Sequence, residues 1–244
     1  MVGPVAGRVG HGDHPQGIPL TLSICTSVWG GHGRFLDDWA RSIAAQSSRP
    51  AEVVIAELGD CRAEADRAAA ALRRIGVRTF VASHRYVGMG EARNVAVAAS
   101  SGEWVMHLDA DDMLLPGALA GVAPLLEHCD VVSLGARYAN GRVRTFPHVS
   151  SRDLLAGRVG CFSCSPYRRS LWERSPYPTE PLFVDRMLWL RFAQLGARFV
   201  GTRWPGFLYR QHPGSFRRTL GASELREVRR QVQQARRDPV RVSA

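Results

Sequence analysis

The feature that most constrains the fold is an alternation of short apolar segments with longer helical segments between residues 20 and 136. The apolar segments are rich in strand-forming residues, and they cover residues 20–26, 52–58, 77–83, 103–109 and 130–136. The segments between them have helical spacing or composition, and they cover residues 34–46, 62–75, 90–100 and 116–128. This alternation predicts βαβ units and therefore an α/β fold, Rossmann-like, with a mostly parallel sheet covered by helices on both faces.

An acidic cluster, "HLDADD", ends the fourth apolar segment and contains Asp109, Asp111 and Asp112. Parallel sheets bind ligands outside the carboxyl ends of their strands, so the cluster lies where a site is expected. Carboxylates this close repel one another, and a divalent cation such as Mg²⁺ or Mn²⁺ would relieve the repulsion. The same residues have a second interpretation, in which Asp112 caps the helix expected at 116–128.

The composition excludes some classes of protein. The 244 residues carry a formal net charge of +10 with no lysine, and a Walker-A phosphate loop requires a lysine. Positive charge fits a polyanion, a phosphorylated substrate, an anionic membrane or simple solubility. Five cysteines, an odd number, indicate a reducing cytoplasm, and "CFSC" (161–164) is either a fortuitous pair or a redox pair. No apolar run is long enough to predict a membrane span, and residues 1–17 have the composition of a flexible tail.

Three blocks of sequence resemble the family 2 nucleotide-sugar glycosyltransferases, which have the GT-A fold. They are "LDDWARSIAAQSSRPAEVVIAELGD", "GMGEARNVAVAASSGEWVMHLDADDMLLPGAL" and "VDRMLWLRFAQLGARFVGTRWPGFLYRQHPGS", in this order. The resemblance runs from about residue 20 to residue 215, and its middle block is the most specific. It implies a GT-A catalytic domain at residues 18–220, divided into a nucleotide-sugar-binding part (18–136) and a smaller acceptor-binding part (137–220). A basic C-terminal helix and tail would then occupy residues 221–244.

The resemblance implies that the donor is a nucleoside diphosphate sugar, with a UDP-sugar favoured, and that Mn²⁺ or Mg²⁺ assists. Asp109 corresponds to the acid that contacts the ribose, Asp111 to the metal ligand, and Arg93 in "ARN" to an arginine beside the nucleotide. Glu57 keeps an acid where the family holds the edge of the base, although a second acid normally follows there. Thr26 is either a nucleotide contact or a threonine at a strand end.

The catalytic base implied by the resemblance is Asp185, at the start of the helix expected at 185–197. Val184 stands where the family usually has a glutamate, which is a departure from its pattern. The dipole of the helix would help to keep the Asp185 carboxylate ionised.

A closing segment near residue 210 is the last part of the expected site. His212 either ligates the metal, or closes over the diphosphate, or is an ordinary loop histidine, and Tyr209 and Arg210 would belong to the same segment. Asp112 either caps the following helix or helps to position the acceptor.

Three functional hypotheses follow. The leading one is a cytoplasmic, metal-dependent, inverting glycosyltransferase, acting on a small-molecule, carrier-bound or lipid-linked acceptor that is held by residues of about 140 to 185. The second is a nucleotidyltransferase acting on a sugar phosphate, although its expected loop "TSVWGGHGR" lacks a lysine. The third is a non-catalytic scaffold that binds a membrane or nucleic acid through its arginines. Basic and aromatic residues do not interleave along the chain, which argues against nucleic acid.

The C-terminal helix expected at 223–237 is basic and amphipathic, with a stripe of Leu225, Val228 and Val232. Three interpretations are open: peripheral contact with an anionic membrane, packing on the chain's own domain, or packing on a partner subunit. The stripe is narrow and has no aromatic residue, so membrane contact is not favoured.

Overall fold

The computed structural model of the chain describes residues 21–86, 88–179, 183–213, 215 and 221–237. The tail expected at 1–17 and the end of the C-terminal segment, 238–244, lie outside the described residues.

A mixed sheet forms the centre of the molecule, and its described strands follow the order β3-β2-β1-β4-β8-β6-β9-β5, with β7 paired to β6. Its first half is parallel: β1 lies between β2 and β4, and β3 pairs with β2. In the second half β6 and β9 are parallel, whereas β8 pairs antiparallel with β4 and β6, and β5 with β9. The strands are β1 (Leu22–Val28), β2 (Glu52–Glu57), β3 (Thr79–Ser83), β4 (Trp104–His107), β5 (Met113–Leu114), β6 (Val131–Tyr138), β7 (Val143–Arg144), β8 (Tyr167–Arg168) and β9 (Phe199–Tyr209).

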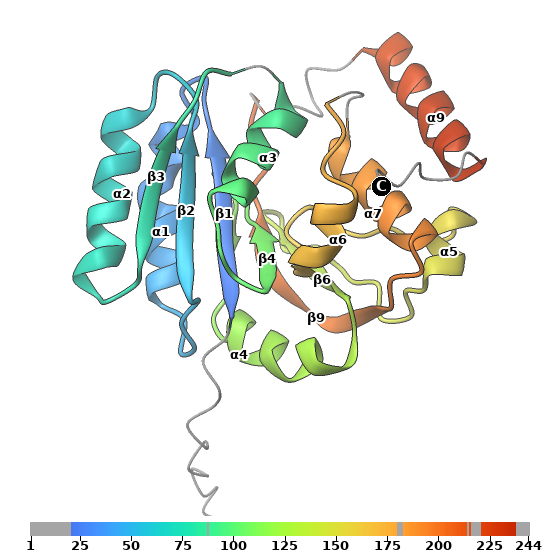
Figure 1. The fold of residues 1–244 in the computed structure, drawn as a ribbon, viewed down its shortest axis with the longest axis horizontal. Coiled ribbons are helices and arrows are strands. Elements are labelled where there is room, and N and C mark those ends of the chain that lie inside the picture. The colour runs from blue at the N-terminus through green and yellow to red at the C-terminus, as the bar shows by residue number, and fades with distance from the viewer. Residues whose placement is uncertain (1–20, 87, 180–182, 214, 216–220, 238–244) are drawn as a thin grey trace, which may run out of the picture.

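Helices cover both faces of this sheet (Figure 1). The helical elements are η1 (His32–Phe35), α1 (Leu36–Ala44), α2 (Arg62–Arg74), α3 (Met89–Ala98), α4 (Ala118–Val122), η2 (Ala123–His128), α5 (Ser151–Leu155), α6 (Arg169–Arg174), α7 (Val184–Gln194) and α9 (Ala222–Arg237). One buried cluster joins α1, α2 and α4 to the sheet through residues such as Trp39 and Leu72. A second cluster joins α3, α5, α6 and α7 to it through Trp189 and Phe192. Successive residues of β2, from Val53 to Ala56, enter opposite clusters, so this strand is apolar on both faces.

The expected strands and helices are present within a few residues of their predicted ends, with one exception. The segment expected as one helix at 116–128 divides into α4 and the 3₁₀ helix η2, because Pro124 has no N–H to donate and its ring obstructs a continuous helix. Six elements were not predicted: β5, β7, β8 and β9, and α5 and α6. In the part of the chain that the structure describes, no helix is both long and apolar enough to span a bilayer.

Candidate active site

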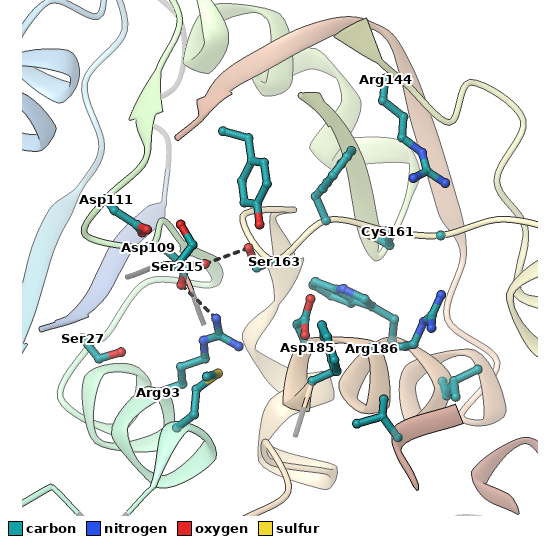
Figure 2. A pocket seen from close by; sticks show the side chains of 18 of the residues that line it. Ser27, Arg93, Asp109, Asp111, Arg144, Cys161, Ser163, Asp185, Arg186 and Ser215 are labelled. Atoms are coloured by element: carbon teal, nitrogen blue, oxygen red, sulfur yellow. Dashed lines mark hydrogen bonds and ion pairs between the residues drawn. The ribbon is translucent and has the colours of Figure 1, made fainter. Parts of the chain in front are cut away.

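The acidic cluster lies at the carboxyl end of β4, beside the end of β1. The main chain turns sharply after β4, since the Asp112 N–H donates to the Asp109 carbonyl oxygen at 3.0 Å. Leu108 holds the start of this turn, because its N–H donates to Cys25 and its carbonyl accepts from the Trp39 indole. The turn opens onto a cavity of about 730 Å³, which Asp109, Asp111 and Asp185 all line. Figure 2 shows Asp109 and Asp111 on one side of this cavity and Asp185 across from them.

Asp109 is compensated by a buried arginine. Arg93, on α3, donates to Asp109 Oδ1 at 2.8 Å, and the Ser163 hydroxyl donates to Oδ2 at 3.0 Å. Burial alone would favour the neutral acid, but Arg93 and these hydrogen bonds bring the pKa of Asp109 below its usual value, so it is ionised. Burial, with the charge of Arg93, lowers the pKa of the neighbouring His107 to about 3, which leaves a neutral imidazole behind the pair.

Asp111 is grouped with two histidines. Its Oδ2 lies 3.0 Å from His212 Nε2, and one ligand atom from each of His32, Asp111 and His212 lies within 4.8 Å of the others. Burial and the negative charge of Asp109 raise the pKa of Asp111, and together they outweigh the hydrogen bond to His212. Two imidazoles and a carboxylate whose ionised form is disfavoured, at this separation, fit a divalent cation. His32, which lies after β1, was missed from the sequence, because no spacing rule connects it to residues so distant along the chain.

Asp112 has a different role from the two acids before it. It is almost completely buried and does not line the cavity, and its Oδ1 accepts the main-chain N–H of Arg210 at 2.9 Å. Its Oδ2 has no partner among the described residues, and at the N-terminus of α4 the Leu119 N–H donates to Gln46 Oε1 at 3.2 Å, so the helix-capping interpretation of Asp112 was wrong. Burial and the charges of Asp111 and Asp109 raise the pKa of Asp112 well above its usual value.

Arg210 also belongs to the support of the site rather than to its lining. Its guanidinium donates to Asp38 at 3.1 Å and lies over the Phe35 ring at 4.9 Å. Together with the Asp112 bond, these contacts hold the end of β9 against α1. His212 follows two residues later, so the same contacts position it beside Asp111. The preceding residue of β9, Tyr209, does line the cavity.

Asp185 is the second residue of α7. Phe183, the residue just before this helix, has a left-handed backbone with φ 66°. Burial raises the pKa of the Asp185 carboxyl, and the negative charge of Asp109 adds to the shift, while Arg93 and main-chain N–H groups of the helix oppose it. The N-terminus of the helix thus favours the ionised carboxylate, as expected, but burial has the larger and opposite effect on the pKa.

Two residues of the expected donor site do not line the cavity. Thr26 is fully buried within β1. The Glu57 carboxylate accepts the N–H groups of Gly59 and Cys61 at 2.7 and 3.1 Å and the Ser83 hydroxyl at 3.2 Å, so it holds the loop after β2. Their roles as nucleotide contacts stay predictions.

An aromatic pair, Trp29 and Tyr86, lines the same end of the cavity as Asp109 and was not singled out from the sequence. The two rings are stacked, with centroids 4.9 Å apart and an angle of 30° between their planes. Isolated aromatic residues after strands are common, and only the fold brings these two loops together.

A mostly parallel sheet whose central strand ends in a D-x-D motif above a ligand-sized cavity defines the GT-A class of glycosyltransferase fold. Residues 23–193 match the family described as "Glycosyl transferase family 2", so the chain belongs to that family. It is 37% identical over 203 residues to the succinoglycan biosynthesis protein ExoO of Rhizobium meliloti (strain 1021). The matched region covers 73% of this chain and 58% of the relative. It is 27% identical over 131 residues to an uncharacterized glycosyltransferase of Haemophilus influenzae, covering 49% of this chain and 43% of that one. The chain thus spans about half the length of these curated relatives.

Two solved structures show the same fold at 20% identity. Residues 1–349 of S. aureus TarS in complex with UDP-GlcNAc superpose with a TM-score of 0.69, covering 88% of this chain and 66% of the other. The mannosyltransferase PcManGT of Pyrobaculum calidifontis, in complex with GDP-Man and Mn²⁺, has a TM-score of 0.65, covering 90% and 65%.

Proposed function

We propose that the chain transfers a sugar from a nucleoside diphosphate sugar to an acceptor, with inversion at the anomeric carbon and with assistance from a divalent cation. The observation that carries the proposal is the convergence of Asp109, Asp111 and Asp185 on one cavity in a member of glycosyl transferase family 2. The acceptor is a small molecule or a carrier-bound or lipid-linked one. Family membership argues against a nucleotidyltransferase, and no observation favours a non-catalytic scaffold.

The donor would occupy the end of the cavity beside β1 and β4. Ionised Asp109 is placed to accept hydrogen bonds from ribose hydroxyls, and Arg93 fixes its orientation. The stacked Trp29 and Tyr86 offer an aromatic surface for a nucleotide base. TarS supports UDP and PcManGT supports GDP as the carrier, and a UDP-sugar remains our preferred donor.

The cation would be held by Asp111 and His212, with His32 as a further ligand. Two imidazoles favour Mn²⁺ over Mg²⁺, which prefers oxygen ligands, and Mn²⁺ is present in the PcManGT complex. When bound, the cation supplies positive charge to the leaving diphosphate. His212 would reach it only because Arg210 and Asp112 hold the end of β9 in place.

Asp185 would act as the general base. A raised pKa improves its ability to take the proton from an acceptor hydroxyl, provided that the solution is alkaline enough to ionise it. Direct displacement by that hydroxyl inverts the anomeric centre. NMR of the first product formed distinguishes inversion from retention. Retention would contradict direct displacement with Asp185 as the single base.

A cytoplasmic location is part of the proposal and is supported by the five cysteines, all of which are free.

Donor screening tests the proposed function. UDP-glucose, UDP-N-acetylglucosamine and GDP-mannose are each added with Mn²⁺ or with EDTA, and thermal stability and donor hydrolysis are measured. One donor should stabilise the protein only when Mn²⁺ is present, because a ligand that binds the native state raises its melting temperature. Equal turnover in excess EDTA would contradict the metal role, and no stabilisation by any donor would contradict the donor site.

A further inference from the structure

The cavity separates charge along its length. Of its described acidic lining residues, Asp109 and Asp111 lie at the end assigned to donor and metal, and Asp185 lies across from them. Its lining continues beyond Asp185 to α9, and there it contains arginines from three different elements: Arg144 of β7, Arg186 of α7, and Arg229 and Arg236 of α9. Figure 2 shows Arg144 and Arg186 on the side of the cavity away from Asp109 and Asp111. We call these four residues the arginine arm.

The arginine arm has no counter-charge among the described residues, because none of its four guanidiniums makes an ion pair with a described carboxylate. Two other arginines of the same region do have one: Arg158 pairs with Asp153, and Arg230 pairs with Glu227. Burial and the positive charge of Arg186 lower the pKa of Arg236, which shows that like charges are held close together. Arginines gathered on a cavity wall without acids favour binding of an anion.

Local structure holds at least one arm residue in position. Arg236 lies against Gly157, after α5, where a Cβ atom would come within 2.6 Å of both terminal guanidinium nitrogens. The Arg236 Nε is buried and has no partner among the described residues. On the opposite wall, Arg144 stacks over the Phe146 ring at 4.9 Å.

Apolar side chains line the same part of the cavity. They are Phe146, Leu154, Val159, Leu190 and Leu225. α9 closes this part because Val228 and Val232 are buried against Met187 and Leu190 of α7. A ligand that fills the arm therefore meets both guanidinium groups and an apolar wall.

We propose that the arginine arm binds an anionic group, a phosphate or a carboxylate, on the acceptor, at a distance from the hydroxyl that Asp185 activates. The inference rests on the proposed function, since it assigns this end of the cavity to the acceptor. Arginine recognises either anion through paired, charge-assisted N–H···O bonds. The apolar wall would accommodate an aliphatic or sugar-ring portion beside the anion.

Calorimetry with the full chain tests this directly, with UDP and Mn²⁺ saturating so that the donor end is filled. The probes are octyl phosphate, in which an apolar chain carries the anion; methyl glucuronide, in which a sugar carries it; and octyl glucoside, which is neutral. The test variant is Arg229→Gln/Arg236→Gln. The matched control is Arg226→Gln/Arg237→Gln, which removes the same charge from exposed positions of α9 that do not line the cavity.

At least one anionic probe should bind wild type more tightly than octyl glucoside does. Its affinity should fall roughly tenfold or more in the test variant and stay unchanged in the control, as expected for lost charge-assisted hydrogen bonds. The anionic probe that binds more tightly identifies the source, a phosphate-bearing chain or an acidic sugar. Equal losses in both variants, or equal binding of the neutral and anionic probes, would overturn the proposal.

A second pair of variants guards against misfolding of α9. Arg144→Gln lies on the opposite wall, and Arg142→Gln, in the same hairpin but outside the cavity lining, is its control. Only Arg144→Gln should weaken the anionic probe, and no difference between the two would again contradict the arm. If an anionic probe binds the arm but no donor is turned over, the proposed function fails and the anion site stands.

Discussion

At the scale of single residues, four carboxylates in and beside the cavity have four different surroundings. Arg93 pairs with Asp109, two histidines approach Asp111, and a main-chain N–H reaches Asp112. Asp185 forms no ion pair with a described arginine or histidine, and burial raises its pKa. In the proposed function these differences correspond to different roles: Asp109 contacts the ribose, Asp111 binds the metal, Asp112 braces β9 and Asp185 transfers the proton.

The metal role of His32 gives the first prediction. His32→Gln should weaken Mn²⁺ binding by roughly tenfold or more, because removing a group that holds a metal usually has an effect of that size. Electron paramagnetic resonance of free Mn²⁺ measures the affinity without turnover. His128→Gln, at an exposed position at the end of η2, is the control and should bind Mn²⁺ like wild type. Unchanged affinity in His32→Gln would leave only Asp111 and His212 as proposed protein ligands.

The raised pKa of Asp185 gives the second prediction. The base acts when ionised, so turnover should fall as the pH drops through a value above the ordinary 3.8. Arg93 lowers this pKa, so Arg93→Gln should move the acid limb of the kcat profile to higher pH. The profile measured for both proteins decides the point. An acid limb at the ordinary aspartate value, or a shift to lower pH in Arg93→Gln, would count against the assignment.

The motif residues of the site could be predicted from the sequence, together with Arg93 and His212, whereas the other partners of the carboxylates could not. Asp109, Asp111 and Asp185 were named from the resemblance, and all three line the cavity. His32 and Ser163 lie far from them along the chain, and only the three-dimensional fold brings the side chains together. The direction of the Asp185 pKa shift likewise depends on burial, which no local pattern reports.

At the scale of elements, the packing of α3 positions Arg93. Asn94, the next residue, donates to the Tyr177 carbonyl at 2.9 Å and accepts bonds from the Tyr177 N–H and the Trp172 indole. In the "ARN" motif, Arg93 therefore pairs with Asp109, and Asn94 joins α3 to the segment after α6 by hydrogen bonds. Gly90, one turn before, permits their close approach.

The close approach of α3 gives the third prediction. Gly90→Ala would place its Cβ on the carbonyl oxygen of Pro178, so the helix or the segment must shift. We expect a loss of about 1–3 kcal/mol in the free energy of unfolding, the usual effect of overpacking, measured by urea denaturation. Gly221→Ala meets no contact shorter than 3.4 Å and serves as the control. Equal stability of Gly90→Ala and wild type would show that the segment yields without strain.

Elements with a regular local pattern were predictable, and β9 was not. Its sequence, "FVGTRWPGFLY", interrupts strand-forming residues with two glycines and a proline, which locally argue against a strand. In the fold, β9 pairs with β6 and β5, and the register against β6 shifts on either side of the Gly135–Pro205 pair. The irregular strand therefore depends on partners that lie far from it in sequence.

At the scale of the whole molecule, α9 packs on the chain's own domain. Val228 and Val232 are buried against α7, and the Gln194 side chain donates to the Ala235 carbonyl at 2.7 Å. Figure 1 shows α9 at the opposite end of the molecule from α2. Of the three interpretations of the sequence, packing on the same chain is the one observed, and it uses the apolar stripe that membrane contact would need.

The docking of α9 gives the fourth prediction. Val232→Asp places a charge in the contact with α7 and should detach the helix, which is rich in arginine and so open to trypsin. Because a buried valine contributes about 1.5–3 kcal/mol, cleavage within α9 should accelerate by roughly 10- to 100-fold. Val143→Asp, at an exposed position of β7, is the control. Equal cleavage rates in the two variants would show that α9 does not depend on this contact.

Substitution of the proposed base tests the central claim most directly. In Asp185→Asn the rate of sugar transfer, or of donor hydrolysis with water as acceptor, should fall roughly 10²- to 10⁴-fold. Donor affinity in Mn²⁺ should stay at the wild-type value, because Asp109 and Asp111 are unchanged. Asp66→Asn, at an exposed position of α2, controls for the loss of a carboxylate. A rate in Asp185→Asn within a few-fold of wild type, with donor still bound, would contradict the account and leave Asp185 as a helix-end residue without a catalytic role.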